Sequence, residues 1–215
     1  MGRTWHLVLA LVVAGSLALQ IGLLLAGGQD VNSGQASASV SLATRFVRFF
    51  SYFTIQSNLL VLAVSASLAI DPQRDGRLWR VLHLDALLGI AVTGVVFATL
   101  LAGLVDAQGA AAWANAGFHY LSPIMAVLGW LFFGPRPRID MRTIALAFVW
   151  PLAWLGYTLL HGASTDWYPY PFLNVDKLGY PRVFVNMGAV LIGATVLAFV
   201  LRSLDRRLPS TRLAS

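Results

Sequence analysis

Long apolar runs, separated by short polar segments, recur along this 215-residue chain. A helix needs about 20 apolar residues to cross the roughly 30 Å hydrocarbon core of a bilayer. Six runs meet or approach this length, and they cover approximately Trp5–Gly27, Phe49–Ile70, Val81–Leu104, Ala114–Phe133, Thr143–Leu160 and Val183–Leu201. The first run exceeds the roughly 7–15 apolar residues of a signal peptide and lacks a small-residue cleavage site. The pattern therefore predicts one all-α domain over residues 1–215, a bundle of six transmembrane helices.

Polar residues inside these runs recur at helical spacings, so each set occupies one face of its helix. Because polar side chains are costly in lipid, these faces are expected to point into the bundle. The second, fourth and fifth helices carry one stripe each: Ser51, Thr54, Asn58 and Ser65; Asn115, His119 and Ser122; Trp154, Tyr157, Thr158 and His161. Gln56 points to the other side of the second helix, and Asn186 is a polar residue of the sixth. The stripes predict the polar interior of the bundle.

Composition narrows the class of protein further. Hydrophobic residues make up 58% of the chain and charged residues 11%, which leaves too few polar side chains to cover an ordinary soluble enzyme. The same balance excludes a disordered chain. The chain has no cysteine, which excludes a disulfide framework, a thiol nucleophile and a cysteine-ligated metal.

The net charge of +6 reflects a basic excess whose distribution predicts the orientation of the helices. Cytoplasmic loops of membrane proteins carry an excess of Lys and Arg. With both termini in the cytoplasm, eleven of the 15 basic residues fall inside: Arg3, Arg74, Arg77, Arg80, Arg136, Arg138, Arg142, Arg202, Arg206, Arg207 and Arg212. The other four, Arg45, Arg48, Lys177 and Arg182, fall outside. The excess therefore indicates membrane topology, and no nucleic-acid partner is expected.

Two sizeable connections are predicted on the outer side. Gly28–Arg45 is rich in Ser and Ala, which is typical of a flexible connector. His161–Arg182 contains the run Trp167-Tyr168-Pro169-Tyr170-Pro171-Phe172. Two interpretations of this run remain open. It either dips into the interface or caps a cavity, or it is a simple aromatic belt at the outer boundary, which Trp113 would share.

Depth along the helices pairs a hydroxyl with an imidazole. Thr54 lies about five residues inside the second helix, or ~7 Å at 1.5 Å per residue, and His119 enters the fourth helix to nearly the same depth. Such a pair can act as nucleophile and general base on a carbonyl, with Asn58, Asn115 or Ser122 donating to the oxyanion. The competing interpretations are a Thr that bonds its own helix and a His that bonds a neighbouring helix.

Other ionisable residues suggest alternatives. Asp85 is expected to pair with an arginine such as Arg80 or to face a wet cavity, where it would relay protons, and His83 is expected near the headgroups. His6 and His83 at the inner boundary, with His119 and His161 at the outer one, also form the pattern of a two-haem electron carrier.

Three segments resemble a known family. They are Phe49-Phe50-Ser51-Tyr52-Phe53-Thr54-Ile55-Gln56-Ser57-Asn58, Phe118-His119-Tyr120-Leu121-Ser122-Pro123, and His161-Gly162 followed by Trp167-Tyr168-Pro169-Tyr170-Pro171-Phe172-Leu173-Asn174. The chain resembles the androgen-induced/androgen-dependent family of six-span membrane proteins, and more closely its bacterial branch. The eukaryotic members hydrolyse fatty acid esters of hydroxy fatty acids. The resemblance implies that Thr54 matches the family's nucleophile and His119 its histidine, whereas Asn174 stands where the animal proteins have an acidic residue.

The leading hypothesis from the sequence is a lipid-ester hydrolase of a bacterial inner membrane, since the preference for Arg over Lys and the abundance of Ala suggest a GC-rich genome. Thr54 would attack and His119 would act as base, without a metal or cofactor. The expected partner is a membrane lipid or lipid-like ester, and the expected substrate-binding residues are Ser51, Asn58, Asn115, Ser122, His161 and Tyr170. The alternative is a non-enzymatic carrier or lipid-binding protein, in which Asp85 matters as much as Thr54.

Overall fold

The computed structural model describes residues 1–34, 36 and 38–209. Within them, six helical segments are long and apolar enough to cross a membrane. Two are single helices, α1 (Gly2–Leu25) and α3 (Phe53–Ile70), and a third, α9 (Val175–Arg207), is helical except at Gly179. The predictions of a helical fold and of six helices long and apolar enough to cross a membrane are therefore confirmed.

The remaining three spans are each built from shorter pieces. Arg77–Leu104 consists of α4 (Arg77–Val96), a π-helical turn η1 (Phe97–Leu101) and a 3₁₀ turn η2 (Ala102–Leu104). Ala110–Phe133 consists of α5 (Ala110–Ala116), a π-helical turn η3 (Gly117–Leu121) and α6 (Ser122–Phe133). Met141–Thr165 consists of α7 (Met141–Ala147) and α8 (Val149–Thr165).

Two prolines account for two of these interruptions. Proline has no N–H to donate, and its ring clashes with the carbonyl of the residue four positions earlier. For Pro151 that residue is Ala147, the last residue of α7. For Pro123 it is His119, which lies in the middle of the π-helical turn η3. The irregular backbone at His119 therefore follows from the position of Pro123.

The predicted start of the second helix, near Phe49, is wrong. The chain leaves the helix at Tyr52, whose backbone is extended (φ −69°, ψ 129°), so that α2 (Leu42–Ser51) is separate from α3. Leu42–Arg45, predicted as part of a flexible connector, instead begin α2. The Arg45 guanidinium donates to the carbonyl of Leu24 at 2.8 Å, which ties this connection to the end of α1.

The last helix begins earlier than Val183, the predicted start. Helical turns begin at Val175, but Gly179 interrupts them with a φ of 72°, a left-handed conformation that favours glycine. The long membrane-crossing part therefore starts close to Pro181. Only 11% of its most apolar window is buried, so α9 lies at the edge of the bundle.

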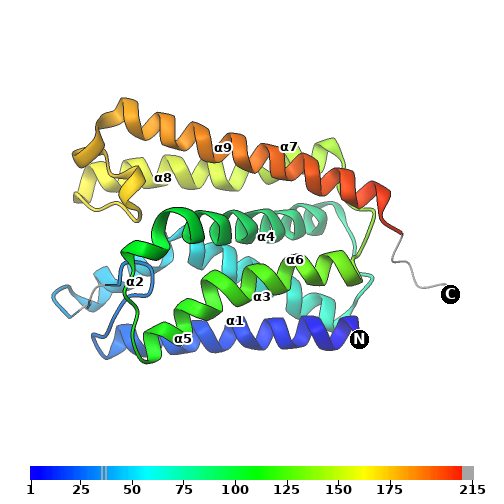
Figure 1. Cartoon of the computed structure of the whole chain (residues 1–215), viewed down its shortest axis with the longest axis horizontal. Coiled ribbons are helices and arrows are strands. Elements are labelled where there is room, and N and C mark those ends of the chain that lie inside the picture. Colours follow the sequence, from blue (N-terminus) through cyan, green and yellow to red (C-terminus); the bar gives the residue numbers. More distant parts are fainter. Residues whose placement is uncertain (35, 37, 210–215) are drawn as a thin grey trace.

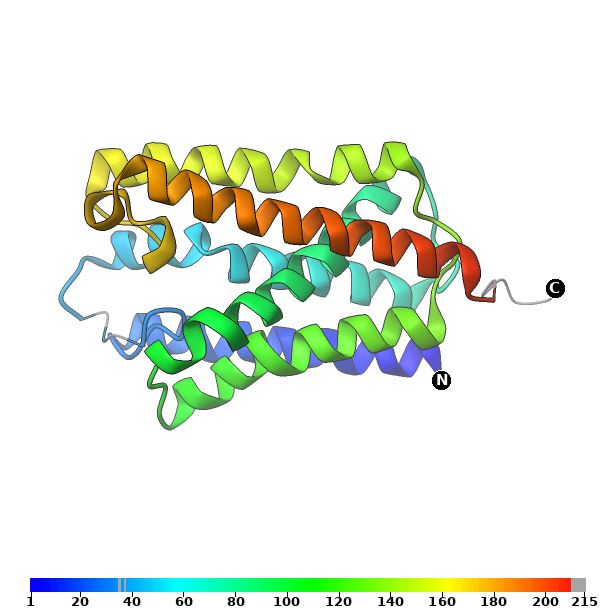
Figure 2. The same ribbon diagram turned by 45° about the horizontal axis from the view of Figure 1, so that its top comes forward.

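The helices are arranged as a larger bundle with a pair alongside it. α1 packs against α3, α5 and α6, and α4 packs against α3 and α6. α8 and α9 lie side by side next to α4, and Figure 1 shows them as a separate layer, whereas α9 overlaps other helices in the turned view of Figure 2. The N-terminus and the end of α9 lie at one end of the molecule, whereas α2 and the connection between α8 and α9 lie at the opposite end (Figure 1).

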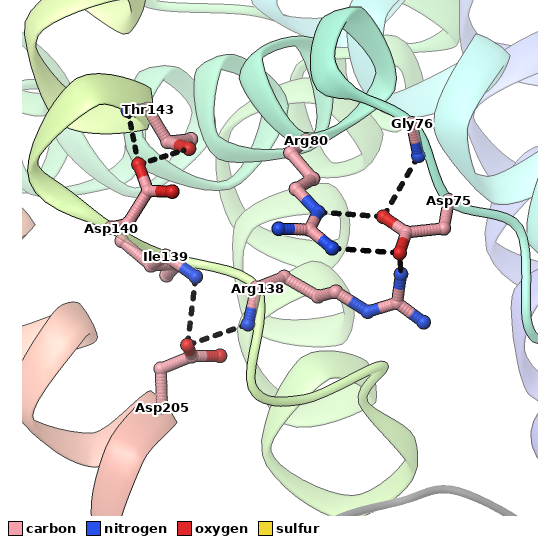
Figure 3. Close-up of polar contacts among 8 residues, drawn as sticks. All are labelled: Asp75, Gly76, Arg80, Arg138, Ile139, Asp140, Thr143 and Asp205. Carbon is pink, nitrogen blue, oxygen red and sulfur yellow. Dashed lines mark hydrogen bonds and ion pairs between the residues drawn. The ribbon is translucent and has the colours of Figure 1, made fainter.

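Asp205 fastens α9 to the bundle at the end that carries both termini (Figure 3). Its carboxylate accepts the backbone N–H groups of Arg138 and Ile139 at 2.7 and 2.8 Å. The Arg138 side chain forms an ion pair with Asp75, which also accepts two hydrogen bonds from Arg80 at 2.7 and 2.8 Å. The loops at this end therefore hold one another through charged groups.

Replacing Asp205 is expected to destabilise the protein. Asp205 is 1% exposed, and Asp205→Ala leaves two backbone donors without their carboxylate. We expect a loss of about 2–4 kcal/mol, measured as a lower melting temperature of the detergent-solubilised protein. Asp71→Ala removes an exposed loop carboxylate that accepts one N–H from Gln73, and it is the control with little expected effect. Equal melting temperatures for the two variants would contradict this assignment.

Candidate functional site

Thr54 lies in the first turn of α3 because the helix begins anew after Tyr52. It is therefore the second residue of a helix and not the fifth or sixth, which corrects its predicted depth. The side chain remains buried, at 3% exposure. The break leaves the Thr54 N–H without a partner inside the helix, and this group donates to a side chain from another element, the Tyr170 hydroxyl. The next two N–H groups, of Ile55 and Gln56, donate to the Tyr52 carbonyl.

Two side chains from distant elements converge on Thr54. Its Oγ1 lies 3.1 Å from the Tyr170 hydroxyl and 3.4 Å from His119 Nε2. Its backbone N–H donates to the same Tyr170 hydroxyl at 3.1 Å. The structure therefore brings together Thr54 and His119, which the sequence paired by depth, and adds Tyr170 from the connection between α8 and α9.

His119 is held by contacts on its other side. Its Nδ1 lies 2.7 Å from Asn115 Oδ1, one turn earlier on the same span. Its ring stacks on Phe97 with 3.9 Å between centroids and 16° between planes. Phe97 and His119 both lie in π-helical turns, which often occur at functional sites. The imidazole is 3% exposed and fixed in one orientation.

These contacts determine the direction of a hydrogen-bond chain. An amide oxygen only accepts, so His119 Nδ1 carries the proton that bonds Asn115, and Nε2 presents a lone pair to Thr54. The Thr54 hydroxyl then donates to Nε2. The Tyr170 oxygen accepts the Thr54 N–H, and its own proton points to Thr54 Oγ1. The four residues form a relay in which the threonine hydroxyl faces a proton acceptor.

Tyr170 comes from the connection between α8 and α9, just before the short turn η4 (Pro171–Leu173). It is 6% exposed and packs against the rings of Tyr52, Trp154 and Phe172. Burial raises the pKa of Tyr170 to about 12, although the hydrogen bonds from Thr54 oppose this shift. The hydroxyl therefore keeps its proton at physiological pH and remains a donor. This contact places the aromatic connection over the site. The structure thus agrees with the interpretation in which the aromatic run caps a cavity.

Asn58, Asn115 and Ser122 were expected to donate to an oxyanion, and their side chains are arranged differently. Asn58 Nδ2 donates to the Thr54 carbonyl at 2.9 Å and to the Phe118 carbonyl at 3.4 Å. Asn115 presents its oxygen to His119. Ser122 is buried, and its Oγ has no hydrogen-bond partner among the described residues. Asn58 and Asn115 therefore position the backbone and the imidazole, and the hydroxyl that lies beside Thr54 Oγ1 is that of Tyr170.

Ser51 and His161 lie near the site without touching Thr54 or His119 through a hydrogen bond. Ser51 Oγ contacts the Tyr157 hydroxyl at 2.6 Å, and its carbonyl accepts from Trp154 Nε1 at 2.9 Å, so Ser51 joins α2 to α8. His161 contacts Thr165 Oγ1 at 3.3 Å, and its ring packs edge-on against Trp167. Both residues support the elements around the site.

A partly open, apolar cavity extends from Thr54 and Tyr170 between α3, α4, α8 and α9. Asp85 lies on its wall. Of the two predicted environments for Asp85, the ion pair with Arg80 is wrong, because Arg80 bonds Asp75 in the preceding loop. The carboxyl group instead faces the cavity from α4.

The four histidines fall into separate environments. His6 and His83 line a second, smaller cavity together with Ser65. His119 and His161 have the different partners described above and contact no common residue through a hydrogen bond. Across the described part of the chain, no group of three or more His, Cys, Asp or Glu side chains is placed to hold a metal ion.

The close approach of Tyr168 to α8 requires a glycine at position 162. A Cβ at Gly162 would overlap the Tyr168 ring, so Gly162→Ala must displace the connection that carries Tyr170. We expect a destabilisation of about 1–3 kcal/mol in thermal melting. Gly156→Ala, on the same helix with open space around its Cβ, should match the parent or exceed it by up to about 1 kcal/mol. An equal response of the two variants would show that this packing does not hold the connection.

Comparison of the chain with family models, with curated proteins and with solved structures finds no match.

Proposed function

We propose that this protein is an intramembrane hydrolase of lipid esters, with Thr54 as the nucleophile and His119 as the general base. The observation that carries the proposal is the directed relay from Tyr170 through Thr54 and His119 to Asn115. A hydroxyl needs an adjacent base to attack a carbonyl, and the base needs a third group to orient it. His119 and Asn115 fit these two roles.

In the first half of the reaction, Thr54 Oγ1 attacks the ester carbonyl carbon and its proton moves to His119 Nε2. The tetrahedral intermediate carries a negative charge on the former carbonyl oxygen. The Tyr170 hydroxyl is a donor next to the nucleophile, and the dipole of α3 favours an anion at the start of this helix. The intermediate then collapses, the C–O bond to the alcohol breaks, and protonated His119 gives its proton to the leaving oxygen.

In the second half, water hydrolyses the ester formed between the acyl group and Thr54. His119 Nε2 takes a proton from water as the water oxygen attacks the acyl carbon. Collapse of this second intermediate returns the proton to Thr54 Oγ1 and releases a carboxylic acid. Asn115 keeps the proton on His119 Nδ1 throughout, so Nε2 alone exchanges protons with the substrate.

The proposal includes an orientation in a bacterial inner membrane with both termini in the cytoplasm. The end with both termini also carries most of the basic residues, among them Arg80 in the first turn of α4 and Arg136 and Arg138 in the loop between α6 and α7. Positive charge is retained on the cytoplasmic side. Thr54 and the aromatic connection would then lie at the outer face, where substrate enters from the outer leaflet.

A second candidate is a carrier that binds a lipid without reacting with it. The observation in its favour is the size of the cavity and the presence of Asp85 on its wall, far along α4 from the relay. This candidate requires saturable binding without turnover.

Replacement of Thr54 tests the enzyme directly. We expect a fluorophosphonate probe to label the purified protein at Thr54, and Thr54→Ala to abolish labelling and ester hydrolysis. His119→Gln should lower kcat/KM by about 10²–10⁴-fold, since the general base is lost. Thr158→Ala removes another buried threonine hydroxyl, one outside the cavity, and is the matched control. Labelling and hydrolysis that survive Thr54→Ala would exclude the proposed nucleophile and favour the carrier.

The orientation can be measured by cysteine labelling, because the chain has no cysteine of its own. Ser164→Cys, at the end with the aromatic connection, should react with a membrane-impermeant maleimide in intact cells. Arg74→Cys, in the loop between α3 and α4, should react only after the membrane is permeabilised. The reverse pattern would overturn the proposed topology and leave the hydrolase chemistry to be judged by Thr54→Ala alone.

A further inference from the structure

The apolar cavity has the length of a lipid tail. Asp85, Gly89, Thr93 and Phe97 all line it and recur every four residues along α4 and into η1. Asp85 and Phe97 are twelve residues apart, which corresponds to about 18 Å at 1.5 Å per residue. This is comparable to the hydrocarbon depth of one leaflet, roughly half of the 30 Å core.

The middle of the cavity suits a hydrocarbon chain. Its walls include Leu88, Val92 and Val96 from α4 and Met187 and Leu191 from α9. The polar groups of the other lining side chains already have partners. Trp150 donates to Gln56 Oε1, Trp154 donates to the Ser51 carbonyl, and Thr93 donates to Ser57.

Asp85 is the exception among these lining residues. It is 5% exposed, and its Oδ1 has no hydrogen-bond partner in the described part of the chain. An intramembrane carboxyl group is expensive to keep unless it meets a partner. Asp85 lies at the end of the cavity away from Phe97 and His119, so the missing partner belongs at that end.

We propose that the cavity binds the acyl chain of the ester and that Asp85 accepts a hydrogen bond from a hydroxyl group carried far along this chain. The proposal rests on the proposed function for the position of the carbonyl at Thr54. It narrows the substrate class to long-chain esters whose acyl chain carries a free hydroxyl group far from the carbonyl. A hydroxyl group suits the site because it supplies the missing donor at a lower desolvation cost than a charged group in apolar surroundings.

The test compares methyl palmitate with methyl ω-hydroxypalmitate, whose chains have equal length. Both are added to Thr54→Ala protein in nanodiscs, where no turnover occurs, and binding is followed by the fluorescence of the cavity tryptophans Trp150 and Trp154. We expect the hydroxylated ester to bind about tenfold more tightly relative to the plain ester. Adding Asp85→Leu should abolish this preference, whereas Asp85→Asn should keep part of it because the amide oxygen still accepts.

Each preference is the ratio of the affinities of one protein for the two esters. The two esters partition into the bilayer in the same way for every variant, so partition does not affect the comparison of the Asp85 variants. Equal binding of the two esters before Asp85 is changed, or an unchanged preference in Asp85→Leu, would overturn the role of Asp85. These measurements do not depend on hydrolysis. If the parent protein is inactive and unlabelled but the preference is present, the proposed function fails while the chain-binding site stands.

A second variant tests occupation of the cavity itself. Ala194 lines it from α9, and Ala194→Phe should fill its space. In the Thr54→Ala background, we expect Ala194→Phe to weaken the binding of methyl palmitate and methyl ω-hydroxypalmitate at least about tenfold. The short ester methyl hexanoate should still bind, which would show that the site is folded. Val196→Phe, on the exposed face of the same helix, is the matched control without effect. Unchanged binding of the long esters to Ala194→Phe would exclude the cavity as the chain site.

Discussion

The hydrogen bonds between the Tyr170 hydroxyl and the start of α3 are the interaction on which the site depends. A membrane allows few free backbone donors, because lipid offers them no partner. The chain nevertheless breaks its second span at Tyr52, and Tyr170 accepts the N–H that the break releases at Thr54. The same hydroxyl contacts Thr54 Oγ1, so one group stabilises the helix terminus, orients the threonine and fixes the outer connection.

At the opposite end of the molecule, charged side chains are the partners of backbone N–H and carbonyl groups. There, Asp205 accepts two backbone N–H groups, and the Arg136 guanidinium donates to the carbonyls of Trp130 and Leu131 at the end of α6. α9 is thus joined to other elements by Asp205 at one end and by the bond from Asn186 to the Phe172 carbonyl near the other. The middle of α9 faces the cavity. Because α9 is held by hydrogen bonds on both sides of this part, an apolar space can exist between α9 and α4.

Hydropathy was sufficient to predict six spans, because length and apolar composition decide membrane insertion. It did not predict the break at Tyr52, since the aromatic run around it contains neither Gly nor Pro and the helical stripe through Ser51 and Thr54 looks continuous. The juxtaposition of Thr54 with His119 agrees with the predicted facing of the two polar stripes, although the depth of Thr54 was counted from the wrong start of its helix. The orienting role of Asn115 and the partner of Arg80 depend on side-chain conformations and on loop geometry, which periodicity does not contain.

The break at Tyr52 also sets the chemistry that the proposed site can perform. A threonine in the middle of a span would meet lipid tails and be remote from water, whereas Thr54 lies in the first turn of its helix. The proposed membrane orientation puts this turn at the boundary of the hydrocarbon core, where the ester groups of lipids lie and where water can release an acyl group. The relay at the boundary and the apolar cavity below it therefore match the two parts of a lipid ester, a polar carbonyl and a long chain. In the proposed reaction, the helix break aligns these parts without moving either one across the membrane.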